Sequence, residues 1–145
     1  MGDGRIDRER GSVAVELAII APAVIAAFVT VMMFGRVMIA NQSIEAVAFD
    51  AARTASLARD GGAAVVAARR AAEETLAAQG LHCRRTEVRV DASQFARPVG
   101  EPANVTVTVE CDVDFRDIAL PGMPGSTTLS ATFTSPLDRY RTRSS

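Results

Sequence analysis

Residues 11–34, GSVAVELAIIAPAVIAAFVTVMMF, decide how the chain is organised. After Glu16 this stretch contains no ionisable side chain, and only Pro22 and a threonine interrupt its apolar sequence. A helix over residues 13–34 would be roughly 33 Å long at about 1.5 Å per residue, which matches a hydrocarbon core of about 30 Å. The stretch therefore predicts a transmembrane helix, which we place at residues 12–35.

The charges on either side of this helix predict its orientation. Several arginines lie in the first ten residues, and Arg36 follows the apolar stretch. Positive residues beside a first span favour the cytoplasmic side. We therefore expect a cytoplasmic leader over residues 1–11, disordered over residues 1–10, and an extracytoplasmic domain over residues 36–145. A cleaved secretory signal is the alternative, but its apolar core of about 7–15 residues would be shorter than this one.

Helical spacing of apolar residues continues beyond the span. We expect one long helix that becomes amphipathic, reaches about Arg59 and stops at residues 60–62, Asp-Gly-Gly. Its alanine-rich stripe would pack either on the domain's own sheet or on another subunit. A second helix is predicted over residues 63–79, with Gly80 at its C-terminal cap. The predicted stripe of the first helix is Ile44, Val47, Ala48, Ala51, Ala52 and Ala55, and that of the second is Val65, Ala68, Ala72 and Leu76.

In the rest of the domain, polar and apolar residues alternate in the pattern that is typical of β-strands. Strands are predicted over residues 86–91, 104–115 and 127–135, separated by loops that contain proline and glycine. Because no helices separate the strands, the sheet should be antiparallel, and the predicted fold class is α+β. The side chains expected to face inward are Val105, Val107, Val109, Cys111, Val113 and Phe115, together with Leu129, Ala131 and Phe133.

Two cysteines, Cys83 and Cys111, follow the span. In an oxidising extracytoplasmic space a disulfide is the default, and it would be worth roughly 3 kcal/mol. Two buried thiols are the alternative.

Other residue patterns argue against catalysis. His82 is the only histidine, and we find no phosphate-binding loop or nucleophile elbow. Acidic residues at 110, 112, 114 and 117 suit a solvated face better than a site for a hard cation. The net charge of −1 gives no reason to expect nucleic-acid binding. We therefore predict a protein that is not an enzyme and that has no cofactor and no metal.

Glu16 is the residue that the membrane span does not explain. A carboxylate in an apolar span costs about 2.5–3.5 kcal/mol at mid-helix and less near an end. Such a residue is expected to have a partner, and an α-amino group just N-terminal to the helix would be a suitable one. The alternative is that Glu16 reaches the membrane interface by itself.

The order of charged leader, Gly11 and apolar helix with Glu16 five positions on resembles the prepilin signal of type IV pilin-like proteins. The segment VELA at 15–18, followed by Pro22, is similar to the V-E-F-A-L-x-x-P pattern of TadE-like pseudopilins of the tight adherence (Flp-type) pilus. Residues 50–55, DAARTA, resemble the A-A-R segment of that family. The chain departs from the pattern conservatively, with leucine for phenylalanine at 17 and isoleucine for leucine at 19.

The resemblance implies a pilin-like fold and a function in pilus assembly. A prepilin peptidase would cut after Gly11, so that the mature subunit begins at Ser12 with Glu16 as its fifth residue. Glu16 would neutralise the N-terminal amine of a neighbouring subunit, and Pro22 would kink the helix. The implied partners are the peptidase, other pilins or pseudopilins, inner-membrane platform proteins, a secretion ATPase and membrane lipid.

The implied protein is a minor pseudopilin of the cell membrane, single-pass with its N-terminus in the cytoplasm, and the resemblance leaves open whether it enters a surface pilus. The alternative function is an unprocessed, membrane-anchored extracytoplasmic binding domain.

Overall fold

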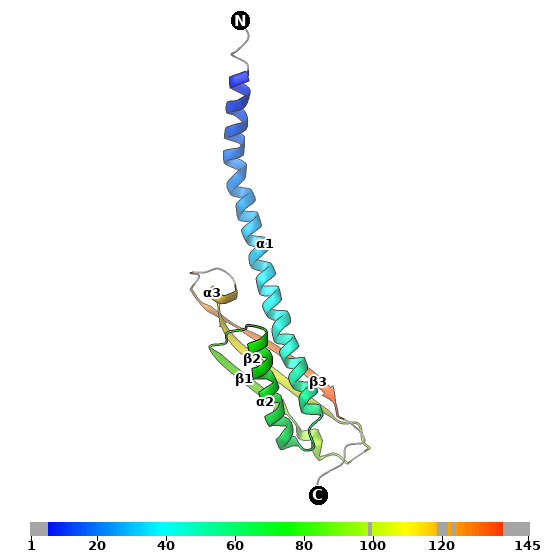
Figure 1. The fold of residues 1–145 in the computed structure, drawn as a ribbon. Helices are drawn as coiled ribbons and strands as arrows, with labels where there is room; N and C mark the ends of the chain where they lie inside the picture. Colours follow the sequence, from blue (N-terminus) through cyan, green and yellow to red (C-terminus); the bar gives the residue numbers. More distant parts are fainter. Residues whose placement is uncertain (1–5, 99, 119–121, 123, 138–145) are drawn as a thin grey trace. The chain divides into compact units, whose positions relative to one another are not determined.

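The computed structural model describes residues 6–98, 100–118, 122 and 124–137, with side chains from Val15 onward. The chain divides into two compact units, residues 1–35 and 36–145. Along the chain come helix α1 (Ile6–Ser56), helix α2 (Gly61–Ala78), strand β1 (Arg85–Asp91), the 3₁₀ helix η1 (Ser93–Ala96), strand β2 (Asn104–Asp114), helix α3 (Phe115–Ile118) and strand β3 (Ser126–Pro136) (Figure 1).

Helix α1 begins earlier than the sequence suggested. It is helical from Ile6, so the expectation of a disordered leader is wrong for residues 6–10, while residues 1–5 lie outside the described part. The helix also continues through Gly11. A glycine inside a helix costs only about 1 kcal/mol relative to alanine, and the arginine and glutamate residues before it favour helix.

The turn between α1 and α2 is set by a cap that the sequence analysis missed. Helix α1 ends at Ser56, three residues before the predicted end at Arg59. Asp60 then accepts a hydrogen bond from the Ala63 backbone N–H at 2.8 Å and forms the N-cap of α2. Such a cap is worth about 1 kcal/mol, so α2 begins at Gly61, two residues earlier than predicted.

The other end of α2 confirms the predicted role of Gly80. Gly80 has a φ of +67°, its N–H donates to the Ala77 carbonyl at 3.1 Å, and the Leu81 N–H donates to the Leu76 carbonyl at 3.2 Å. This pair of bonds is the Schellman arrangement, in which the residue after the cap needs a left-handed conformation.

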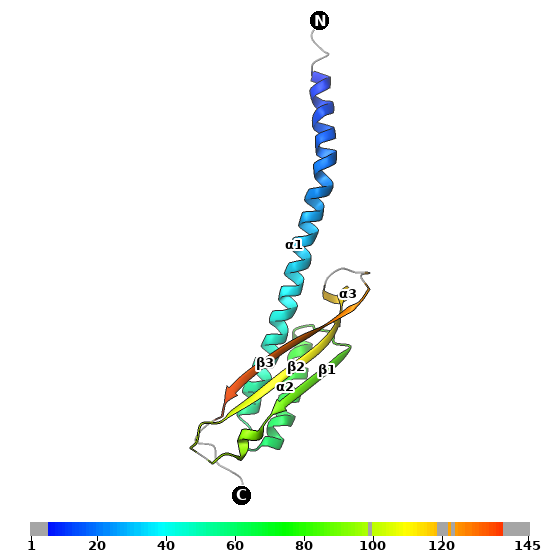
Figure 2. The same cartoon turned by 180° about the vertical axis from the view of Figure 1, so that it is seen from behind.

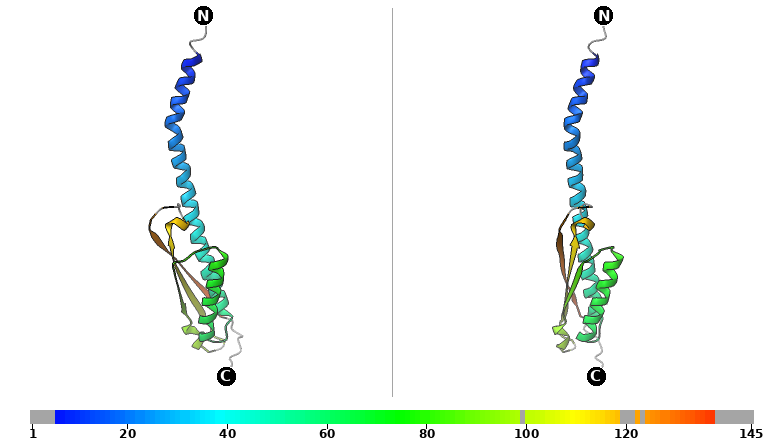
Figure 3. Two further views of the ribbon diagram at one scale, coloured as in Figure 1. Left: turned by 60° about the vertical axis from the view of Figure 1, so that its left-hand side comes forward. Right: turned by 90° about the vertical axis from the view of Figure 1, so that its left-hand side faces the viewer.

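The predicted three-stranded antiparallel sheet is confirmed. The strand order is β1-β2-β3, with β2 in the centre and both pairings antiparallel. Figures 2 and 3 show the strands side by side with α2 on one side of the sheet. On the opposite side, threonine hydroxyls bond across the strands, Thr106 to Thr134 at 2.9 Å and Thr108 to Thr132 at 2.8 Å. This face is polar, as expected for an antiparallel sheet with one face toward water.

The alanine-rich stripe of α1 packs within its own domain. All its predicted members are buried, and they form one core with α2 and the inward side chains of β2. In α2, Ala64 and Ala71 are buried instead of Val65, which is half-buried. The packing on the domain's own sheet is therefore confirmed, rather than packing on another subunit.

One inward prediction fails at the sheet's edge, and one predicted strand residue lies outside the sheet. Phe133 remains 38% exposed, because β3 is an edge strand. The Phe49 ring covers it only in part, in an edge-to-face contact with the two ring centroids 4.7 Å apart. Phe115 begins α3 instead of ending β2, but its half-buried side chain still packs against the core. In contrast, Leu137, which follows the predicted end of the last strand, is buried, and its N–H donates to the Ala103 carbonyl.

Replacing Ala68 with leucine should test how closely this core is packed. Ala68 is fully buried in α2, so a larger side chain must displace its neighbours and should lower the free energy of unfolding by about 1–3 kcal/mol. Urea unfolding of the detergent-solubilised protein, followed by circular dichroism, measures this loss. Ala78→Leu is the matched control, because Ala78 is exposed in the same helix. Equal stability of the two variants would contradict close packing at residue 68.

Candidate membrane and assembly site

The first described part of α1 exposes large apolar side chains. Ile19 is 70% exposed, Phe28 is 65% exposed, and most other large apolar residues between Val15 and Phe34 are also exposed. Burial of apolar surface is favourable by roughly 25 cal/mol per Å², so a continuous surface of this kind needs lipid or protein around it. By length and composition, this helix could cross a membrane. These features are consistent with a single-pass membrane protein.

Glu16 lies at the start of this apolar surface. Its side chain is exposed, between the exposed side chains of Val15 and Leu17. In a helix, Ser12 and Glu16 are one turn apart on the same face, with backbones about 6 Å apart along the axis. An amino group at Ser12 would therefore be presented on the same face as the Glu16 carboxylate.

Pro22 lies inside α1, and the helix continues through it. Proline has no N–H, so the carbonyl of Ala18 lacks the usual donor four residues on. The kink at Pro22 stays a prediction, as does cleavage between Gly11 and Ser12.

Cys83 and Cys111 form the predicted disulfide, with their Cα atoms 5.3 Å apart. Cys111 is fully buried on the central strand, whereas Cys83 is half-buried in the segment between α2 and β1. The bond therefore ties this connecting segment to the middle of the sheet.

The acidic residues of β2 all have protein partners. Arg89 contacts Glu110 at 3.2 Å, Arg84 contacts Asp114 at 3.4 Å, and the Thr128 hydroxyl donates to Asp112 at 2.6 Å. In the described part of the chain, no cluster of at least three potential metal ligands occurs. The structure therefore shows these carboxylates as members of a polar, ion-paired face.

The same face holds an ion pair along β1. The Arg89 guanidinium donates a hydrogen bond to Glu87 at 2.7 Å. This bond, assisted by the positive charges of Arg89 and Arg85, lowers the pKa of Glu87 below its ordinary value. The pair keeps both side chains charged on the exposed surface of the sheet.

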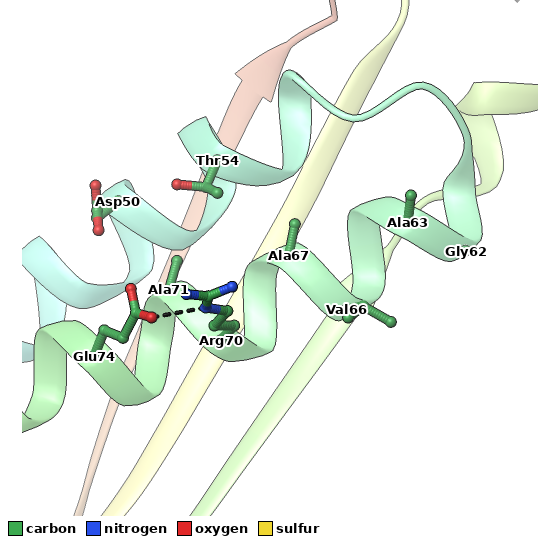
Figure 4. A pocket seen from close by; sticks show the side chains of 9 residues that line it. All are labelled: Asp50, Thr54, Gly62, Ala63, Val66, Ala67, Arg70, Ala71 and Glu74. Atoms are coloured by element: carbon green, nitrogen blue, oxygen red, sulfur yellow. Dashed lines mark hydrogen bonds and ion pairs between the residues drawn. The ribbon is translucent and has the colours of Figure 1, made fainter.

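A groove of about 640 Å³ lies between α1 and α2. Figure 4 shows Asp50 and Thr54 of α1 on one side and the ion-paired Arg70 and Glu74 of α2 on the other. The remaining lining is mostly alanine and glycine, and Asp50 already accepts a hydrogen bond from Thr75 at 2.8 Å. This groove was not predicted from the sequence, because it depends on how the two helices pack.

The segment of α1 that contains these residues matches a known protein family. Residues 11–53 match the model of the TadE-like protein family. This stretch of the chain is therefore similar to TadE-like proteins. The TadE-like segment includes Gly11, Ser12, Glu16 and Pro22, and it ends within the alanine-rich stripe at Arg53. No curated protein and no solved structure matches the chain.

Proposed function

We propose that this chain is a TadE-like minor pseudopilin that takes part in assembly or secretion of a tight adherence (Flp-type) pilus. The observation that carries the proposal is the family match over residues 11–53, which includes the exposed apolar surface of α1. The TadE-like family indicates a function in the Tad pilus system and a structural role instead of an enzymatic one.

In this proposal, a prepilin peptidase cleaves after Gly11 on the cytoplasmic side and the helix stays in the mature subunit. The subunit remains in the membrane with its N-terminus cytoplasmic and residues 36–145 outside, together with other pilins or pseudopilins, inner-membrane platform proteins and a secretion ATPase. Cleavage creates an amino group one turn before Glu16. An unpaired charge in lipid is costly, so this amine and the carboxylate of a neighbouring subunit would select each other.

Replacing Gly11 with alanine is the experiment that tests processing. In cells that contain a prepilin peptidase, the wild-type protein should begin at Ser12 when its N-terminus is sequenced after membrane extraction. The Gly11→Ala variant should keep its leader and migrate more slowly on a denaturing gel.

The matched control for this test is Gly35→Ala. Gly35 lies in the same helix, and an added Cβ at this position would meet nothing within 4 Å. The control should therefore be processed like the wild type. An intact leader on the wild-type protein would contradict the proposal and favour an unprocessed, membrane-anchored binding domain.

A further inference from the structure

The two edges of the sheet differ in their side chains. The edge strand β1 has seven residues, and it carries charges at Arg85, Glu87, Arg89 and Asp91. Such charges keep an edge from pairing with other strands. The other edge strand, β3, has the sequence STTLSATFTSP over its 11 residues and contains no charged side chain. Only Pro136, at the last position of β3, has the chemistry that blocks strand pairing.

The backbone of β3 directs every second pair of its hydrogen-bonding groups to the open edge. The Phe115 N–H donates to the Gly125 carbonyl at 3.1 Å, and the Leu137 N–H donates to the Ala103 carbonyl at 2.8 Å. These bonds continue the β2–β3 register at its two ends, so the odd-numbered residues of β3 bond to β2 and the even-numbered ones point away. The groups that point away include those of Thr128, Ser130, Thr132 and Thr134. Within the described residues, none of these groups has a backbone partner.

A groove of about 600 Å³ lies beside this edge, between residues 130–133 of β3 and the face of α1 that carries Ala46 and Phe49. The rings of Phe49 and Phe133 meet there, and these residues remain 44% and 38% exposed. Apolar surface left in water is unfavourable, and aromatic side chains have much of it to bury. The groove therefore offers an apolar contact next to the unpaired backbone groups.

The widths of the two layers explain why the groove is open. Helix α2 and the buried part of α1 lie on one face of the sheet (Figure 3). Packed helices are about 10 Å apart, so two of them cover about 20 Å. Three strands at a spacing of about 4.8 Å cover only about 14 Å. The helix layer therefore has room for one more strand, and the groove places that room beside β3.

From these observations we propose that β3 accepts one added strand from another polypeptide chain. The occupant is an extended segment whose backbone pairs with the outward groups of β3 and whose alternate side chains, aliphatic or aromatic, cover Phe49 and Phe133. It has no helix on its inner side, because a second helix layer would collide with α1. The surface lies wholly within residues 36–145. The proposal therefore goes beyond the processing and membrane roles proposed above and does not depend on them.

A synthetic peptide of sequence TVKVTVK tests the strand addition. Its binding to the full-length, detergent-solubilised protein is followed by the anisotropy of a fluorescein label. Two further peptides carry backbone N-methyl groups, one at the valines and the other at the residues between them. Only one of these sets of N–H groups faces β3 in an added strand. One methylated peptide should therefore bind like the parent, and the other should bind about tenfold more weakly or less.

The peptide results decide between strand addition and other modes of contact. No binding of the parent peptide would overturn the proposal. Equal binding of the two methylated peptides would also overturn it, because a contact made through side chains alone does not distinguish the two edges of the peptide.

Replacing Thr132 with proline tests the same contact from the side of the protein. Proline removes the outward N–H of residue 132 and leaves the bonds between β2 and β3 in place, so the variant should bind the parent peptide about tenfold more weakly. Thr132→Val is the matched control, because it also loses the hydroxyl bond to Thr108 but keeps its N–H. Circular dichroism shows whether both variants fold, and the methylated peptides decide the matter on the wild-type protein. Equal binding by two folded variants would overturn the proposal.

The apolar part of the contact is tested with Phe133→Ala. Loss of this ring should weaken binding of the parent peptide several-fold. Val66→Ala is the control, because Val66 is 69% exposed on α2 and does not line this groove. Equal affinities of the two variants would overturn the placement of the peptide's apolar side chains in the groove.

Sedimentation velocity tests the other possible occupant of the edge, a second copy of this chain. We expect Thr132→Pro to sediment like the wild-type protein in detergent. A wild-type dimer that Thr132→Pro dissociates would show that a second copy pairs through β3, and it would overturn the assignment of this edge to a single added strand.

Discussion

Replacing Glu16 with glutamine is expected to abolish pilus assembly while the protein still inserts in the membrane. Glu16 is exposed at the start of the apolar surface of α1, one helical turn after Ser12. The substitution keeps the shape of the side chain and removes its charge, so a neighbouring subunit's amine would be left unpaired in a medium of low dielectric constant.

The size of the effect follows from the cost of an unpaired buried charge. Removing one partner of a buried ion pair costs about 3–5 kcal/mol, which corresponds to roughly a hundredfold or greater loss of subunit association. Membrane insertion should be unchanged or improved, because a neutral amide is less costly in lipid than a carboxylate. Electron microscopy of surface pili and immunoblots of the membrane fraction measure the two outcomes separately.

The control for this experiment is Glu45→Gln. Glu45 is an exposed glutamate of the same helix, beyond the apolar stretch, so its variant should assemble normally. Wild-type numbers of pili on cells that carry only the Glu16→Gln variant would contradict the pairing mechanism, whereas failure of membrane insertion would show that Glu16 acts earlier than assembly.

The second large effect is expected from loss of the Cys83–Cys111 disulfide. The bond closes a loop with a sequence separation of 28 residues. The chain-entropy relation then gives about 3.5 kcal/mol of stabilisation. Small domains have a total stability of only about 5–15 kcal/mol, so Cys83→Ser should lower the melting temperature by on the order of 15 °C.

Thermal melts with and without reductant distinguish the stabilising effect of the disulfide from the effect of the serine substitution itself. Reduction should lower the melting temperature of the wild-type protein and leave that of Cys83→Ser unchanged. Cys111→Ser should be less stable than Cys83→Ser, because Cys111 is fully buried and a serine hydroxyl there would lack water. A wild-type melt that does not respond to complete reduction would show that the disulfide does not stabilise the fold.

The residues tested in these two experiments differ in how far they can be predicted from the sequence. The proposed roles of Gly11 and Glu16 depend on their spacing along one helix, and helical spacing can be counted along the chain. The disulfide acts through the distance between a connecting segment and the central strand, which is a property of the packed domain. The sequence predicted the pairing from the redox environment, and the structure shows where the bond lies.

The sequence by itself determined the elements whose signals are local and periodic. The buried stripe from Ile44 to Ala55 follows the helical period, and the buried side of β2 follows alternation. The TadE-like resemblance also came from residues close together on one helix, and the match over residues 11–53 confirmed it.

Tertiary structure alone decided the features that depend on how the elements meet. It placed the alanine-rich stripe against the domain's own sheet, left Phe133 exposed on an edge strand, and brought α3 to the same groove as Arg36. These outcomes depend on which surfaces cover one another. Apolar spacing shows that a face must be buried, but the partner that buries it is chosen by the packing of the whole domain.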